Sequence, residues 1–320
     1  MAGLLAAHML RRPVSIVEAA AKLPNNHKAL LRFRTSAVGD LCGVPFQKVK
    51  VLKCVASDNN DAASAMEYAR KVTGEYSLRS LSSSFTTEIV ERFIAPDDCI
   101  ERMGQPLVAG FSVAFATDVT EISSGHLQIT DLESAPPSGR TVQRNGPIIS
   151  TMPMPKLMDL LQYQGERPKF RYRSGFTVRF NVKNANAHAT VYIPSRHVQA
   201  YRASITGNHV MIEYACDLFG ADLDVIDNAI EIADEYLGIS PHDIDGAVLI
   251  HPYHYAKIAP IDEDLRRSFI VWASMHYNVY SLGRFATWRP GLLMDDVVND
   301  VRVIDRLISG NNVYEHLLRS

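Results

Sequence analysis

The sequence has few cysteines, and it lacks repeats and tracts of biased composition. Its four cysteines, Cys42, Cys54, Cys99 and Cys216, lie far apart and include no Cys-x-x-Cys pair. This spacing argues against a disulfide framework and against a zinc site, and it fits a reducing cytosol. We find no internal repeat and no low-complexity segment. The sequence therefore predicts a globular protein without a bound metal.

Long apolar runs are also absent. No stretch approaches the ~20 apolar residues that a helix needs to span a bilayer. Residues 1–10 are apolar, but the arginines follow this run rather than precede it, and Pro13 stops it, which is not the order of a secretory signal. These absences predict a cytoplasmic protein that does not use a membrane as a partner.

The chain carries no excess of charge of one sign. Its 33 Lys and Arg residues oppose 35 Asp and Glu residues, which leaves a net charge of −2. This balance argues against general binding to nucleic acid. A length of 320 residues with 47% hydrophobic and 21% charged content is typical of a globular protein with room for two domains.

Hydrophobic periodicity predicts helices near both ends of the chain and a β-rich middle. Residues 4–9 can line one side of a helix that ends before Pro13, and residues 14–17 form a short strand that closes on Glu18. Between residues 176 and 214, apolar and polar residues alternate as in an antiparallel sheet, with Gly207-Asn208 as a hairpin turn. Other predicted strands cover residues 49–55, 107–113, 126–130, 141–144, 147–153 and 280–283, and other predicted helices cover 62–72 and 156–163, follow Asp222 and Asp262, and occupy 297–307.

The start of the chain carries part of a dinucleotide-binding pattern. In such proteins a glycine-rich turn lets bare backbone approach a pyrophosphate, and an acid after the second strand binds a ribose. Here Gly3 occupies the place of the third glycine, and Glu18 follows fifteen residues later, whereas the first strand and two glycines are absent. Either the reading frame starts too late or the fold has lost that strand. An ordinary amphipathic helix before an ordinary strand explains the same residues equally well.

A second candidate cofactor segment lies near the end of the chain. A Gly-Arg pair, Gly283 and Arg284, leaves a short apolar strand, Trp288 follows, and Asp295 and Asp296 open the last helix. A glycine lets backbone pass close to a ligand, an arginine can offset a phosphate charge, and amides at a helix start can face the electron-accepting edge of a ligand ring. The two acids can equally serve as helix N-caps.

Candidate substrate-binding residues lie on the predicted antiparallel sheet. Tyr192, Tyr201 and Arg202 combine aromatic faces with a guanidinium, which suits a nucleotide or another anionic ligand. Aromatic and basic residues are also common on the surfaces of sheets that bind nothing. The sheet residues are therefore candidates for ligand contact rather than a recognised motif.

A further candidate is the polar and aromatic cluster at residues 251–255. Its two histidines, three apart, would suit a metal on a helix, but Pro252 and the lack of nearby carboxylates argue against one. We expect a loop over the active site instead, with His254 and Tyr255 facing the substrate.

Taken together, these segments resemble the FAD-dependent family of UDP-galactopyranose mutases and flavin amine oxidases. The matching stretches occur in the order of the family, at residues 2–7, 14–18, 149–155, 201–207 and 281–297. The resemblance implies an α/β fold in which a Rossmann-like FAD-binding domain, without its first strand, holds an inserted mixed or antiparallel β substrate domain. It also implies FAD as cofactor, contacted by the residues named above in the first and last segments.

The resemblance further predicts how the chain is divided and what it does. The FAD-binding domain would comprise residues 1–75 and 275–320 with part of 100–155, and the substrate domain residues 156–274. The implied activity is that of a FAD-dependent oxidoreductase or mutase-like enzyme acting on a small amine, sugar-nucleotide or nucleotide-linked substrate. Because the flavin itself does the bond-making in such enzymes, no side-chain catalyst is assigned. The alternative is a truncated, non-catalytic relative that serves as a binding or structural partner.

Overall fold

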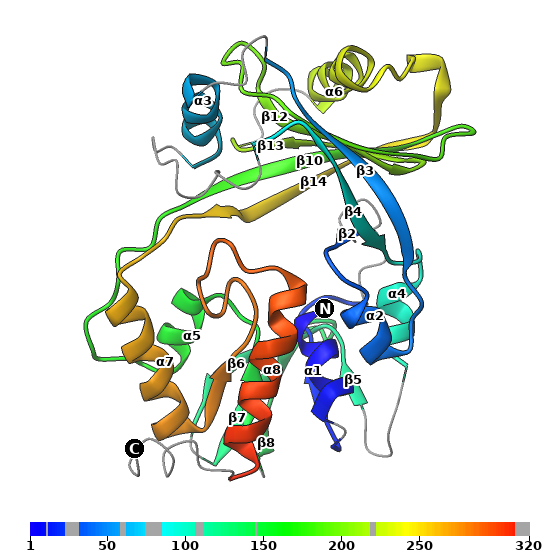
Figure 1. Cartoon of the computed structure of the whole chain (residues 1–320). Helices are drawn as coiled ribbons and strands as arrows, with labels where there is room; N and C mark the ends of the chain where they lie inside the picture. The colour runs from blue at the N-terminus through cyan, green and yellow to red at the C-terminus, as the bar shows by residue number, and fades with distance from the viewer. Residues whose placement is uncertain are drawn as a thin grey trace, which may run out of the picture.

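The chain folds into a large β-sheet that lies over a smaller layer of helices and short strands, as the computed structural model in Figure 1 shows. The structure describes residues 1–10, 12–22, 32–57, 62–73, 85–105, 112–123, 125–144, 146–217 and 222–310. We call the large sheet with its two covering helices the upper part, and the remainder the lower part. Among the described helices, none is both long and apolar enough to cross a membrane.

The upper part is built on an eight-stranded sheet of order β14-β10-β13-β12-β11-β3-β4-β2. Neighbouring strands run antiparallel except β11 and β3, which pair in parallel with Ala189 opposite Leu52. The strands are β2 (Arg32–Phe33), β3 (Gln47–Val55), β4 (Glu88–Ile94), β10 (Tyr172–Val182), β11 (Ala187–Tyr192), β12 (Ala200–Gly207), β13 (His209–Tyr214) and β14 (Ile244–Ile258). The predicted antiparallel sheet is therefore present, and it recruits three strands from the first hundred residues.

Alternation along these strands gives the sheet one apolar and one polar face. Val178, Ile205 and Ile212 belong to the fully buried set that packs with Ala229 and Ala233 of α6 (Asp222–Leu237). Helix α6 lies on this outer face in Figure 1, whereas α3 (Ala62–Thr73) packs through Tyr68 against Tyr192 and Tyr201 at one end of the sheet. The inner face points toward the lower part and carries, beside apolar residues such as Val51 and Met211, the buried polar side chains of the sheet: Lys53, Thr177, Arg179, Thr190, Ser204, Thr206 and Glu213.

The lower part contains two separate pairs of parallel strands. β1 (Ser15–Val17) pairs with β5 (Ser112–Ala114), and β9 (Ile148–Ser150) pairs with β15 (Val279–Ser281). A three-stranded antiparallel sheet of β6 (Thr117–Ile122), β7 (His126–Asp131) and β8 (Ser138–Gln143) lies beside them. The helices of this part are α1 (Ala2–Leu10), α2 (Ala37–Cys42), α4 (Cys99–Met103), α5 (Met154–Leu160), α7 (Glu263–Tyr277) and α8 (Met294–Ile308).

The two ends of the chain pack against each other in the lower part. Leu4 and Leu5 of α1 share one hydrophobic core with Val297, Val301 and Ile304 of α8, and the two helices lie side by side in Figure 1. The helical spacing of residues 297, 298, 301 and 304 places these side chains on one buried face, as the periodicity predicts. Helices α1 and α8, almost 300 residues apart in sequence, thus pack together into one unit.

One predicted loop is a strand. Residues 251–255 lie inside β14, where Thr177 pairs with His251 and Gly175 pairs with Tyr253 on β10. Proline is compatible with this strand, because β14 lies at the edge of the sheet, where sheets tolerate proline. The expectation of a loop over the active site is therefore wrong, although the segment does lie on the sheet above the lower part.

Candidate functional site

The N-terminus of α1 lies against the carboxyl ends of the parallel strands. A side chain at Gly3 would first meet the Thr151 Cγ2 atom at 3.9 Å, just after β9, and one at Gly283 would meet the Ala2 Cβ atom at 3.3 Å, just after β15. Gly283 has φ +90°, a conformation that a residue with a side chain rarely adopts. Ligands of open α/β sheets bind at this end of the strands, where the helix amides favour an anion. The predicted residues Gly3 and Gly283 are brought together here.

Glu18 lies in the same region, directly after the end of β1. Its backbone N–H donates to the Ala114 carbonyl on β5 at 2.9 Å, and its carboxylate accepts from the Ala20 N–H at 2.9 Å. Burial lowers the pKa of the Met1 amino group, and the negative charge of Glu18 partly offsets that effect, which places the carboxylate near the start of α1. Glu18 and Gly283 thus flank the same helix end.

Arg284 follows Gly283 and points into a buried environment. Burial lowers the pKa of its guanidinium, the positive charge of Arg202 adds to the lowering, and its Nε atom has no hydrogen-bond partner among the described residues. Ser150 and Ser281, the last residues of β9 and β15, face each other in register, and both hydroxyls are buried without a partner. Buried polar atoms in folded proteins are nearly always hydrogen-bonded. Three unpartnered polar atoms at these strand ends therefore indicate a place for a ligand.

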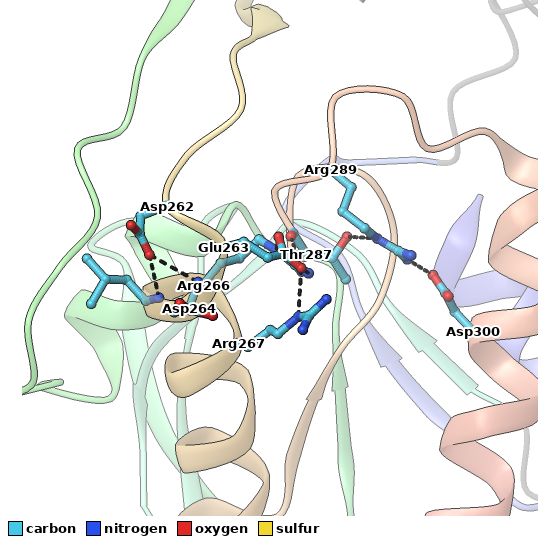
Figure 2. Close-up of polar contacts among 9 residues, drawn as sticks. Asp262, Glu263, Asp264, Arg266, Arg267, Thr287, Arg289 and Asp300 are labelled. Atoms are coloured by element: carbon cyan, nitrogen blue, oxygen red, sulfur yellow. Dashed lines mark hydrogen bonds and ion pairs between the residues drawn. The ribbon is translucent and has the colours of Figure 1, made fainter. Parts of the chain in front are cut away.

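The loop from Gly283 to Leu292 is held by α7 and α8. The Arg266 guanidinium of α7 donates to the Thr287 carbonyl oxygen at 3.0 Å, and the Thr287 hydroxyl donates to the Gly283 carbonyl at 2.8 Å. Arg289 forms an ion pair with Asp300 of α8, which Figure 2 shows. The conformation at Gly283 is thereby fixed by two helices that flank the loop.

Trp288 is a core residue of this loop. Only 1% of it is exposed, its indole N–H donates to the Ala259 carbonyl at 3.0 Å, and its ring packs edge-on against Phe170 and Tyr255. The structure thus gives Trp288 a packing role, and its predicted contact with a cofactor stays a prediction. Tyr255 belongs to the same aromatic cluster.

The two acids at the start of α8 bind backbone amides. Asp295 accepts from the N–H groups of Arg34 and Thr35 at 3.1 and 2.9 Å, and from the Thr35 hydroxyl at 2.7 Å. Asp296 accepts from the Leu293 N–H at 2.9 Å, as in a capping box. Both acids therefore stabilise local structure: Asp296 caps α8, and Asp295 ties α8 to the turn that leads into α2.

A cluster of positive charges gathers where the inner face of the sheet meets Arg284. We call it the cationic cluster: Arg32 of β2, Arg202 of β12, Lys257 of β14 and Arg284 of the loop, around the carboxylate of Glu213 on β13. Arg202 and Glu213 form an ion pair, and the Lys257 ammonium lies 4.4 Å from the centre of the Tyr201 ring. These groups come from five separate segments of the chain.

The charges in this cluster perturb one another. Burial lowers the pKa of Lys257 to about 7, and the positive charges of Arg202 and Arg284 add to the lowering against the opposing charge of Glu213. Burial also lowers the pKa of Arg32 to about 10, with Arg202 contributing. Burial alone would raise the pKa of Glu213, but Arg202 and Lys257 outweigh it, and the pKa lies below its usual value. The cluster thus carries an excess of positive charge that is partly shielded from water.

The remaining predicted substrate residues divide between this cluster and the surroundings. Tyr201 and Arg202 belong to it, since the Tyr201 hydroxyl donates to Glu213 at 2.5 Å. Tyr192 is 9% exposed and packs edge-on against Tyr68 of α3, with 5.5 Å between ring centres. His254 is exposed on β14, outside the cluster. Of the predicted substrate residues, Tyr201 and Arg202 are the two whose charges affect the pKa of Arg284.

A separate cleft of about 490 Å³ opens between α7, the loop and α8. Its charged side chains already bind one another, because Arg266 pairs with Glu263 at 2.6 Å and Arg289 pairs with Asp300. Its lining residues are Pro260, Ile261, Glu263, Arg266, Trp288, Arg289, Pro290, Gly291, Leu292, Asp296, Asn299 and Asp300. The cleft contains none of the unpartnered donors described above, so the cationic cluster is the stronger candidate for ligand binding.

Three members of the cluster, Arg32, Glu213 and Lys257, are absent from the predicted site residues. Glu213 is the single charged residue of the strand sequence His-Val-Met-Ile-Glu-Tyr, and Lys257 is the single basic residue in the second half of β14 apart from its histidine. A lone charge in an apolar strand is a detectable signal, because burial of a charge requires a partner. The identity of that partner depends on strand pairing that the sequence alone does not show.

No protein-family model matches this chain, and a search of curated proteins finds no match. Solved structures do resemble it. Reduced UDP-galactopyranose mutase aligns with a TM-score of 0.70 and 13% identity over 96% of this chain and 92% of that protein. A putative protoporphyrinogen oxidase from Exiguobacterium sp. 255-15 aligns with a TM-score of 0.63 and 11% identity over 97% of both chains. A flavoprotein/dehydrogenase from Cytophaga hutchinsonii aligns with a TM-score of 0.56 and 12% identity over 98% of this chain and 77% of that one.

These similarities concern the fold, since the identities are low. The neighbours are named as a mutase, an oxidase and a flavoprotein/dehydrogenase, and this chain has their mixed α/β architecture. The predicted fold class is therefore confirmed.

Proposed function

We propose that this chain is a FAD-dependent enzyme of the oxidoreductase or mutase-like kind, acting on a small substrate that binds between the flavin and the inner face of the large sheet. The fold similarity to flavoproteins supports this proposal. The observation that carries it is the meeting of the α1 N-terminus with Gly283, where a side chain would meet the Ala2 Cβ atom at 3.3 Å and would be strained at φ +90°.

The residues at this place fit a dinucleotide with a flavin. The amides at the start of α1 suit a pyrophosphate, and the carboxylate of Glu18 suits ribose hydroxyls. The unpartnered donors at Ser150, Ser281 and Arg284 suit the polar edge of a flavin ring. Bound FAD would supply hydride or nucleophilic chemistry at its ring, while this chain orients the reactants and excludes water. Candidate substrates are a small amine, a sugar nucleotide or a nucleotide-linked compound.

The matched variants Gly283→Ala and Gly291→Ala test the proposal. A methyl group at Gly283 meets Ala2 at 3.3 Å and forces an alanine to φ +90°, whereas one at Gly291, in the same loop, meets nothing within 4 Å. We expect Gly283→Ala to weaken FAD binding at least ~10-fold, which corresponds to about 1.4 kcal/mol, and Gly291→Ala to leave it unchanged. Flavin fluorescence quenching measures the affinity, and circular dichroism checks the fold.

Two results of this experiment argue against the proposal. A wild-type protein that folds stably, is colourless and ignores added FAD supports instead the non-catalytic alternative, a binding or structural partner. Equal FAD affinity in both glycine variants would remove the α1 and Gly283 contact from the cofactor site.

A further inference from the structure

The cationic cluster has more positive charges than its carboxylate can neutralise. Glu213 accepts a hydrogen bond from Tyr201 and pairs with Arg202, so both of its oxygens are engaged. Lys257 makes no hydrogen bond or ion pair among the described residues and lies over the Tyr201 ring instead. The Nε atom of Arg284 is buried without a partner in the same part of the structure. Two cations of the cluster therefore lack an acceptor.

The groups around Lys257 come from every element packed against it. On β10, Arg173 lies opposite Lys257 in register and donates to the Lys71 carbonyl of α3 at 3.1 Å. The other charged or titratable groups that face the cluster are Tyr201 and Arg202 of β12, Glu213 of β13, Arg32 of β2, Arg92 of β4, Tyr68 of α3, His188 and Tyr192 of β11 and Arg284 of the loop. Only one carboxylate occurs among these described neighbours, so the local balance favours an added negative charge.

We propose that the cationic cluster binds an oxyanion group of the ligand, such as a phosphate or a carboxylate, and that Lys257 takes up one proton when this group binds. This proposal rests on the proposed function, which places Arg284 beside the flavin. It adds two statements: the substrate carries a negative charge, and its binding is coupled to the uptake of a proton. The balance is simple: the neutral amine of Lys257, a proton from solvent and the oxyanion give an ammonium paired with the oxyanion.

The physical reason is linkage between anion and proton binding. Near neutral pH about half of the Lys257 side chains are uncharged, because burial and the charges of Arg202 and Arg284 bring its pKa to about 7. An oxyanion within the cluster stabilises the ammonium form and raises that pKa. Anion affinity must then fall as pH rises, by roughly tenfold between pH 6 and pH 8 if the pKa in the complex reaches about 9.

Titration calorimetry with sodium sulfate tests this linkage on the purified full chain. Sulfate keeps its double charge between pH 6 and 8, so any proton taken up comes to the protein. The heat of binding at pH 7, measured in buffers of different ionisation enthalpy, gives the number of protons. We expect an uptake of about half a proton per sulfate in the wild type.

Three variants separate the linkage from simple attraction. Lys257→Arg keeps a permanent charge, and we expect it to bind sulfate with no proton uptake. Lys257→Met should bind more weakly and independently of pH. Lys53→Met removes another buried lysine of the same sheet, one that already pairs with Glu88 at 2.6 Å, and should leave the uptake unchanged.

The outcomes distinguish this inference from the proposed function. Failure of the wild type to bind sulfate, binding without proton uptake, or uptake that persists in Lys257→Arg would overturn the inference. The FAD content of the same samples is read from their visible absorbance. Yellow protein without proton-linked sulfate binding rejects the oxyanion site alone, whereas proton-linked binding by a protein that cannot take up FAD rejects the flavin assignment alone.

Discussion

Replacing Glu213 with Gln removes the carboxylate that holds the cationic cluster together. The Glu213 side chain is 7% exposed and that of its partner Arg202 is 27% exposed, so the variant leaves a largely buried guanidinium beside Lys257 and Arg284 without its counter-charge. Breaking a buried ion pair by removing one partner costs about 3–5 kcal/mol. Because Arg202 keeps some contact with water, we expect a loss near the lower end, about 3 kcal/mol.

Urea unfolding followed by circular dichroism measures this loss. The matched control is Glu91→Gln, which breaks an ion pair with Lys48 whose side chains are 60% and 56% exposed, and which we expect to cost at most about 1 kcal/mol. Adding Arg202→Met to Glu213→Gln should recover part of the stability, because the unpaired charge is then gone. A Glu213→Gln variant as stable as the wild type, or no recovery in the double variant, would refute the electrostatic reasoning.

Three further predictions follow from the same contacts. The pKa of Lys257 falls from 10.5 to about 7 on folding, so between these pH values the unfolded chain binds one more proton than the folded chain. We therefore expect the stability of the wild type, measured by urea unfolding, to rise from pH 7 to pH 9 relative to that of Lys257→Met. A stability difference that stays constant with pH contradicts this. Asp295→Ala removes the hydrogen bonds to Thr35, and we expect it to lower the free energy of unfolding by about 1–2 kcal/mol in thermal unfolding. Asp295→Asn should retain part of that stability. Equal losses in the two variants would contradict the role of Asp295 in tying α8 to Thr35. Trp288→Ala leaves a cavity in the core and removes the hydrogen bond to the Ala259 carbonyl, so we expect it to lower the free energy of unfolding in urea by about 3–5 kcal/mol. A loss below about 1 kcal/mol would show that the indole is not packed as described.

Local patterns predicted much of the secondary structure. The alternation between residues 176 and 214 corresponds to β10 to β13, and Gly207, at φ +65°, ends β12 at the predicted hairpin turn. Asp262 caps α7 through the amides of Asp264 and Leu265, as its position before a helical pattern indicates. These features depend on neighbours in sequence, which is why single-sequence reasoning finds them.

Long-range pairing accounts for what the sequence did not predict. β3 joins the large sheet through a parallel register with β11, and β14 accommodates Pro252 because it lies at the sheet edge. The cationic cluster likewise depends on the register that sets Arg202 opposite Glu213. Such pairings are decided by tertiary contacts that local periodicity does not contain.

The most direct test of the central claim is a crystal structure of the full chain grown with FAD. We predict electron density for the pyrophosphate at the N-terminus of α1, with a ribose beside Glu18 and the flavin ring beside Gly283 and Arg284. Density for FAD elsewhere on the surface, or a well-ordered α1 and Gly283 loop with no flavin at saturating concentration, would contradict the account.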